Sequence, residues 1–201
     1  MTQERASVEW LPAALRRGAP WKNGGGITRE VVASPAGAGL DRFDWRISTA
    51  EVRTAGPFSA FPGIERTLCI LEGTLSLAIA GRTAILLSAD SAPFEFAGDD
   101  PAHGAPLDGP VVDLNVMARR GSFNARVQRV QAGAAVQICT DTTVLFALGV
   151  LTVAAGGRAW VLTRGDALRF FGPGDCRLES SENAAAYRIE IAPATALREL
   201  G

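Results

Sequence analysis

Histidine and lysine are almost missing from this sequence of 201 residues, because each occurs only once, as His103 and Lys22. A single histidine excludes any metal site that needs three imidazole ligands. It also leaves no Ser/His/Asp or Cys/His arrangement to assign as a catalytic group. We therefore predict no metal centre and no cofactor. His103, in the loop from Asp100 to Gly104, is expected to have a surface or turn role.

Long apolar runs, excess charge and paired cysteines are also lacking. No run of 18 or more apolar residues occurs, and charges and prolines interrupt the first twenty residues, so we expect a cytoplasmic protein that binds no membrane. The formal net charge of −1 argues against nucleic acid as a partner. The three cysteines form no CxxC pair, and we expect Cys69 and Cys139 to be buried in strands.

Short alternating apolar segments fill most of the chain. Gly, Pro, Asp or Asn interrupts them roughly every eight to twelve residues, which is typical of a β-sandwich or a β-barrel. Only residues 193–200 favour a helix, and a short one. The pattern therefore predicts an all-β protein.

The sequence contains an internal repeat. Residues 71–94 (LEGTLSLAIAGRTAILLSADSAPF) match residues 147–170 (ALGVLTVAAGGRAWVLTRGDALRF) at a shift of 76 residues. The matched positions include a turn glycine, a Gly-Arg pair, an aspartate and a phenylalanine. Glycines at such positions allow the tight turns of β-hairpins, so we predict a duplicated module of hairpins.

The ordered Gly, Leu, Gly-Arg, Asp and Phe of this module resemble the central part of the cupin fold. Four further segments together resemble the HutD/Ves family: PWKNGGGITREV at 20–31, FDWRISTAEV at 43–52, GPFSAFPGIERTLCILEG at 56–73 and DLNVMARRG at 113–121. The resemblance implies a bicupin, with two cupin-type β-barrels (double-stranded β-helix or jelly roll) in one chain. We expect an N-terminal half at 1–121 with the ligand pocket and a structural C-terminal half at 122–201. The sequence also allows the two halves to exchange strands.

The same resemblance implies a function in bacterial histidine utilisation. The family is thought to modulate that pathway by binding a small metabolite rather than by an established reaction. Acids similar to formylglutamate or urocanate are the implied ligands, and a homodimer is compatible with this interpretation. One alternative is an isomerase or hydrolase that uses Glu51 or Asp113 as acid or base. Another is an interaction module with a vestigial pocket.

Arg66 is the central candidate for ligand binding. In metal-binding cupins a carboxylate ligand lies seven residues before the turn glycine, and counting back from Gly73 gives Arg66. A guanidinium suits a bidentate carboxylate, so this position favours an acidic ligand. An internal ion pair with Glu72 or Glu51 is the alternative. Thr142 stands at the matching position of the second half, which is therefore expected to be structural.

Strand alternation and a glycine-rich segment supply the other candidates. Asp44, Arg46 and Ser48 share one strand face, and Asp113 and Asn115 share another. If these faces meet inside the first barrel, they surround Arg66, although a sheet with one solvated face fits equally well. Glycines 24–26 favour close approach of the backbone to a ligand, with a tight N-terminal turn as the alternative. The candidate ligand-binding residues are Trp21, Lys22, Asn23, Thr28, Arg29, Arg46, Ser48, Glu51, Arg66, Asp113 and Asn115.

Overall fold

The computed structural model describes residues 7–21, 24–180, 182 and 184–195. Nearly all regular structure in these ranges is β-strand, and the one helical turn is the 3-10 helix η1 (Ala13–Leu15). No helix among the described residues is long and apolar enough to cross a membrane. The chain divides into two compact units, which we call the N-terminal unit (residues 16–123) and the C-terminal unit (residues 7–15 and 124–195).

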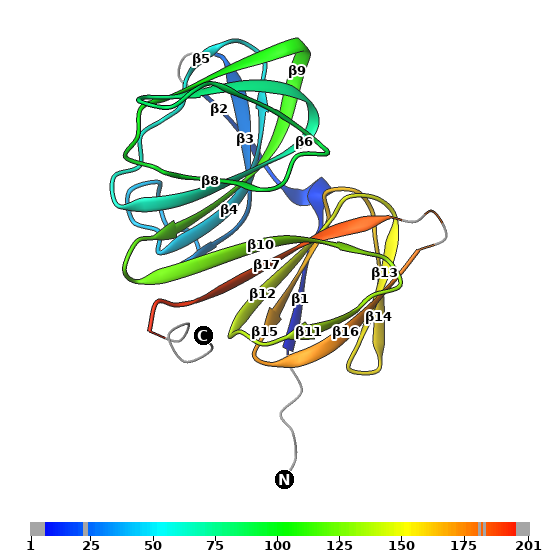
Figure 1. Ribbon diagram of the computed structural model, residues 1–201. Helices are drawn as coiled ribbons and strands as arrows, with labels where there is room; N and C mark the ends of the chain where they lie inside the picture. Colours follow the sequence, from blue (N-terminus) through cyan, green and yellow to red (C-terminus); the bar gives the residue numbers. More distant parts are fainter. Residues whose placement is uncertain (1–6, 22–23, 181, 183, 196–201) are drawn as a thin grey trace. The chain divides into compact units, whose positions relative to one another are not determined.

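The N-terminal unit is one antiparallel eight-stranded sheet (Figure 1). Its strand order is β2-β3-β4-β9-β6-β7, with β5 paired to β9 and β8 paired to β6. The strands are β2 (Gly18–Pro20), β3 (Gly26–Ser34), β4 (Trp45–Val52), β5 (Gly56–Pro57), β6 (Ile64–Ile79), β7 (Ile85–Ser88), β8 (Phe94–Ala97) and β9 (Ala102–Arg119). The two longest strands, β6 and β9, pair over most of their length and carry the residues of the candidate site.

The C-terminal unit contains a five-stranded sheet, in the order β1-β15-β12-β17-β10, and a four-stranded sheet, in the order β11-β16-β13-β14. Its strands are β1 (Ser7–Leu11), β10 (Phe123–Gln131), β11 (Ala135–Ile138), β12 (Thr142–Ala147), β13 (Leu151–Ala155), β14 (Arg158–Leu162), β15 (Ala167–Phe171), β16 (Gly174–Glu179) and β17 (Ala185–Pro193). Strand β1 (blue in Figure 1) pairs with β15, so the first described strand belongs with the C-terminal residues. From the sequence we expect the boundary between the two halves after residue 121, with exchange of strands between the halves as an open alternative.

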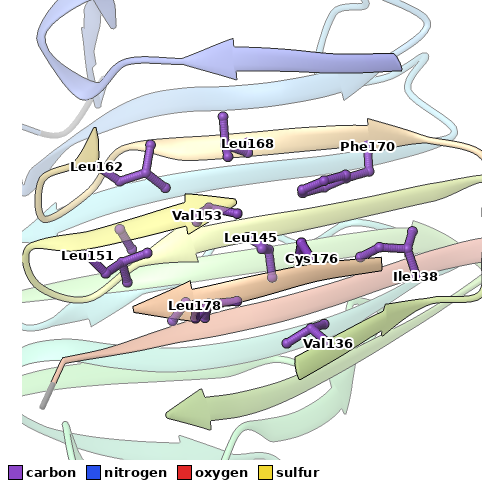
Figure 2. Close-up of a cluster of buried hydrophobic side chains, with 12 residues drawn as sticks. Val136, Ile138, Leu145, Leu151, Val153, Leu162, Leu168, Phe170, Cys176 and Leu178 are labelled. Carbon is purple, nitrogen blue, oxygen red and sulfur yellow. The ribbon is translucent and has the colours of Figure 1, made fainter. Parts of the chain in front are cut away.

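Each unit buries its own apolar cluster. In the C-terminal unit, twelve buried side chains from both sheets face one another (Figure 2), among them Leu145, Leu168 and Phe170. In the N-terminal unit, Leu68, Ile70 and Val111 belong to the main cluster. We call the sheet face that carries these three residues the core face of the N-terminal unit.

The repeated segments both form antiparallel hairpins, β6–β7 and β13–β14. Gly81 and Gly157 have positive φ values of 76° and 79°, a conformation that glycine adopts without strain. The turn expected at the Gly-Arg pair is therefore present in both units. Gly73, expected in a turn, instead lies inside β6, next to an irregularity in the register with β9.

Two expectations from the sequence are wrong. Cys139 follows the end of β11 and is exposed, whereas Cys69 and Cys176 are buried. The helix expected from residue 193 does not begin there, because Pro193 is the last residue of β17 and the next two residues form a turn. Residues 196–200 lie outside the described residues.

Candidate functional site

Polar side chains from three adjacent strands share the core face of the N-terminal unit. Strand β9 lies between β4 and β6, and direct cross-strand partners point to the same side of a sheet. The partners form three rows across these strands, which are Arg46–Met117–Arg66, Ser48–Asn115–Leu68 and Ala50–Asp113–Ile70. The register therefore brings Arg46, Ser48, Arg66, Asp113 and Asn115 together on one face.

These five polar residues are buried. Their exposed fractions are 8% for Arg46, 2% for Ser48, 6% for Arg66, 1% for Asp113 and 7% for Asn115. Charged residues are seldom so buried unless they have partners, because burial removes their hydration. The hydrogen bonds of each group therefore decide what the site can do.

A chain of hydrogen bonds connects Arg66 to Asp113. Arg66 Nη2 donates to Asn115 Oδ1 at 2.7 Å, and Asn115 Nδ2 donates to Asp113 Oδ1 at 2.6 Å. Arg66 Nη1 also donates to the backbone oxygen of Ser59 at 3.3 Å. The amide of Asn115 thus lies between the cation and the carboxyl group and is oriented by both of them.

The Arg66 guanidinium keeps donors without a partner among the described residues. A guanidinium has five N–H groups, and the two hydrogen bonds above use two of them. Its Nε is buried and has no hydrogen-bond partner in the described ranges. Nor does any carboxylate oxygen of the described residues lie within 4.0 Å of this guanidinium.

The two internal ion pairs considered for Arg66 do not form. Glu72 is exposed and lies beyond an irregularity in the register after Ile70. Glu51 pairs directly with Ile27 and Val112, so it lies on the sheet face opposite Arg66. It accepts a hydrogen bond from Arg53 Nε at 2.8 Å, and this bond lowers the pKa of the Glu51 carboxyl group.

Three aromatic rings surround the Arg66 guanidinium. Its Cζ lies 5.5 Å from the ring centroids of Phe58 and Phe61 and 4.9 Å from that of Phe96. Such distances allow cation–π attraction. Gly104 leaves room for one ring, because a Cβ atom there would lie 2.5 Å from Phe58 Cε1. These rings are not among the residues predicted from the sequence, although Phe58 and Phe61 lie in a segment that carries the family resemblance.

Burial shifts both ends of the chain of hydrogen bonds toward neutrality. It lowers the pKa of Arg66 to about 10, an effect that nearby Asp113 opposes. It raises the pKa of Asp113 to about 7, against the opposing effects of Arg66 and of hydrogen bonds from Asn115 and the Ala50 backbone. At neutral pH Arg66 therefore remains a cation, while Asp113 is near the midpoint of its titration and neutralises that charge only in part.

Arg46 has a carboxylate partner, in contrast to Arg66. Its Nε donates to Glu30 Oε2 at 2.9 Å, and its Nη1 donates to Ser48 Oγ at 3.2 Å. Glu30 pairs with Ser48 across the strands, next to a β-bulge between Glu30 and Val32. The sequence left carboxylate chemistry through Glu30 open but did not place Glu30 beside Arg46, because that position depends on the register of β3 with β4.

The remaining candidates are distributed over both faces of the sheet. Thr28 pairs with Ala50 on the core face and accepts a hydrogen bond from Trp21 Nε1 at 2.8 Å. Arg29 pairs with Thr49 and therefore lies on the opposite face. Lys22 and Asn23 lie outside the described residues. No group of three or more His, Cys, Asp or Glu side chains in the described ranges is placed to hold a metal ion.

Solved structures with little sequence identity share this architecture. Oxalate decarboxylase of Lactobacillus farciminis, at 9% identity, superposes with a TM-score of 0.62 over 90% of this chain and 85% of its own. The Escherichia coli protein Ylba, also at 9% identity, gives a TM-score of 0.70 over 94% and 92%. At such identities the likeness concerns the fold alone, which is the all-β cupin fold.

Proteins with greater identity identify the family. The HutD family model matches residues 13–187. An uncharacterised 21.2 kDa protein of the Pseudomonas putida hutC 3′ region is 31% identical over 174 residues, or 85% of this chain and 86% of that protein. Protein Ves of Citrobacter koseri is 37% identical over 158 residues, or 78% and 75%. The structure of HutD from Pseudomonas fluorescens SBW25 superposes with a TM-score of 0.81 at 27% identity, over 93% and 99%. This chain belongs to the HutD family, which its name links to histidine utilisation.

Proposed function

We propose that this chain is a cytoplasmic, metal-independent protein that binds a small carboxylate metabolite at Arg66 and thereby moderates histidine utilisation. One observation carries the proposal. The buried Arg66 guanidinium has unused N–H groups and no carboxylate within 4.0 Å among the described residues. A buried cation without a counter-ion is costly, and a bound carboxylate offers both the missing charge and the missing acceptors.

The surroundings of Arg66 favour an anion over water as its partner. The rings of Phe58, Phe61 and Phe96 lie around the guanidinium, so the local environment is apolar. Coulomb attraction is stronger in such an environment than in water. The bond from Arg66 to Asn115 keeps the guanidinium in one orientation, which reduces the entropy lost when a carboxylate binds.

The family indicates which acids to test. The HutD structure from Pseudomonas fluorescens was determined in a formate condition, and formate is a minimal carboxylate. Formylglutamate-like and urocanate-like acids, which the family resemblance implies, carry the same group on a larger skeleton. All of these acids offer the planar pair of oxygens that a guanidinium binds through two N–H groups.

Isothermal titration calorimetry with formate, N-formylglutamate and urocanate tests the proposal. We expect Arg66→Met to weaken binding of the acid that binds best by about ten-fold or more, since a charged hydrogen bond contributes about 1.5–3 kcal/mol. The control is Arg82→Gln, because Arg82 is half-exposed in an ion pair with Asp100 in the same unit. Equal affinity in wild type and Arg66→Met, or no binding of any of these acids, would contradict the proposal.

One observation favours a second function, catalysis by Asp113. Its carboxyl group is buried, is connected to Arg66 through Asn115, and has a pKa raised to about 7, where a general acid or base works well. This function corresponds to an isomerase or hydrolase that acts on the same acids. We expect it to show as turnover by chelator-treated protein that Asp113→Asn abolishes. Binding without turnover would leave the first function alone.

A further inference from the structure

The guanidinium groups of Arg46 and Arg66 both lie on the core face and donate to two neighbouring residues. Arg46 Nη1 donates to Ser48 Oγ, and Arg66 Nη2 donates to Asn115 Oδ1. Ser48 and Asn115 are direct cross-strand partners, whose Cβ atoms lie about 5 Å apart in an antiparallel sheet. The two cations therefore lie close enough for one small molecule to contact both.

Arg46 and Arg66 differ in whether a carboxylate of the described residues lies close to them. Arg66 has no carboxylate within 4.0 Å among the described residues, whereas Arg46 has Glu30 at 2.9 Å. The Arg46 side chain is only 9% exposed, but that of Glu30 is 40% exposed. The exposed carboxylate of Glu30 loses little when it leaves Arg46, because water solvates it well, and a ligand carboxylate would take its place as the counter-ion of the buried Arg46. Another carboxylate can therefore replace Glu30 at small cost.

We infer that Arg46 is a second anchor, that the site prefers dicarboxylates over monocarboxylates, and that Glu30 competes with the second carboxylate of the ligand. This inference rests on the proposed function, because Arg66 must hold the first carboxylate. Among the described residues Arg46 has hydrogen-bond partners at Nε and Nη1 and none at Nη2, so its Nη2 group is available to the ligand. Arg46 and Glu30 thus determine specificity, while Arg66 determines whether an acid binds at all.

Calorimetry with matched acids tests the preference. Glutarate and valerate have the same number of carbon atoms and differ by one carboxylate, and succinate and butyrate form a second matched pair. For the wild type we expect each dicarboxylate to bind about ten-fold more tightly than its monocarboxylate partner, as a charged hydrogen bond predicts. Equal affinities within each pair would overturn the inference.

Two variants separate specificity from folding. We expect Arg46→Gln, made together with Glu30→Gln so that no carboxylate loses its partner, to bind glutarate and valerate equally. We expect Glu30→Gln alone to tighten glutarate binding by about three-fold or more and valerate binding by less, because only the dicarboxylate gains a direct contact with Arg46. A purely structural ion pair would not change the ratio of the two affinities. Thermal unfolding and circular dichroism check that both variants fold.

The outcomes distinguish this inference from the proposed function. If all four acids bind through Arg66 without a preference for dicarboxylates, the proposed function stands and the second anchor is wrong. If Glu30→Gln weakens glutarate binding, the inference that Glu30 competes with the second carboxylate of the ligand is wrong. If none of the four acids binds to the wild type at millimolar concentration, the second anchor and the simple carboxylate site at Arg66 both fail.

Discussion

Arg66 in the N-terminal unit and Arg188 in the C-terminal unit are both arginines on core-facing strand positions, yet only Arg188 has an acidic partner. Arg188 pairs across the strands with Leu145 of the C-terminal apolar cluster. Its Nη2 lies 3.3 Å from Glu190 Oε2 and also donates to Gln128 Oε1. The C-terminal unit thus neutralises its own cation, whereas among the described residues no carboxylate oxygen lies within 4.0 Å of the Arg66 guanidinium.

The internal repeat did not predict this contrast. Thr142 stands where the repeat places the counterpart of Arg66, so the C-terminal half was expected to lack a charged pair. The pair nevertheless exists, because Arg188 and Glu190 come from β17, outside the repeated segment. The two units therefore place their core-facing cations on different strands, β6 and β17, and only the cation on β17 has an acidic partner among the described residues.

Core substitutions test most directly whether acid binding depends on the N-terminal unit and not on the C-terminal unit. We expect Leu145→Ala to lower the free energy of unfolding by about 3–4 kcal/mol, because Leu145 is fully buried and its removal leaves a cavity. Its effect on acid binding should be less than two-fold. Urea unfolding and calorimetry measure the two quantities.

The matched control for Leu145→Ala is Leu68→Ala, since Leu68 is 1% exposed and pairs directly with Asn115. We expect a similar loss of stability together with weaker acid binding. If Leu145→Ala weakened binding as much as Leu68→Ala, the assignment of the acid site to the N-terminal unit would be wrong.

Replacing each arginine by methionine should have different effects on stability. Arg188→Met leaves Glu190, whose side chain is 13% exposed, without its cation, and we expect a loss of about 1–3 kcal/mol in the free energy of unfolding. Arg66→Met removes a buried cation that has no carboxylate within 4.0 Å in the part of the chain that the structure describes. Its stability should therefore stay within about 1 kcal/mol of the wild-type value. A larger loss for Arg66→Met in urea unfolding would show that Arg66 is mainly structural.

The pH dependence of stability tests the electrostatics of the N-terminal unit, with the smallest expected effect. The pKa of Asp113 is raised to about 7 in the folded protein, so folding favours its protonated form. Its contribution to stability is full below the unfolded pKa of about 3.9 and is lost as the pH rises through 7. We expect Asp113→Asn to reduce the fall in the melting temperature between pH 5.5 and pH 8 by about 2–6 °C.

Asp41→Asn is the control for this measurement, because the Asp41 side chain is 78% exposed. It should leave the fall in melting temperature unchanged. If Asp113→Asn also left it unchanged, the carboxyl group would not titrate near neutral pH in the folded protein.

Much of the candidate site could be predicted from the sequence, because strand alternation depends only on local backbone geometry. The common faces of Arg46 with Ser48 and of Asp113 with Asn115 follow from this rule, and the register confirms both. The register shows Glu51 on the strand face opposite Arg46. Nothing in the sequence indicated which face carries the buried cluster, so Glu51 and Arg29 remained candidates although they lie on the other face.

The aromatic rings and Glu30 show what alternation could not predict. Phe58 and Phe61 lie before β6 and Phe96 lies on β8, and their approach to Arg66 depends on how distant segments pack. The place of Glu30 beside Arg46 depends on the register of β3 with β4, which pairs Glu30 directly with Ser48. The exposed position of Cys139 likewise depends on where β11 ends.

By itself the sequence determined that this protein is built from strands and that it has too few histidines for a three-histidine metal site, because these features depend on composition and periodicity. The resemblance to metal-binding cupins directed attention to Arg66. Only the tertiary structure decided that, among the described residues, Arg66 has no carboxylate within 4.0 Å while Arg46 and Arg188 each have one. Long-range strand pairing sets the distances between charges, and a distance of a few ångströms determines whether a buried cation is already neutralised or can bind a ligand.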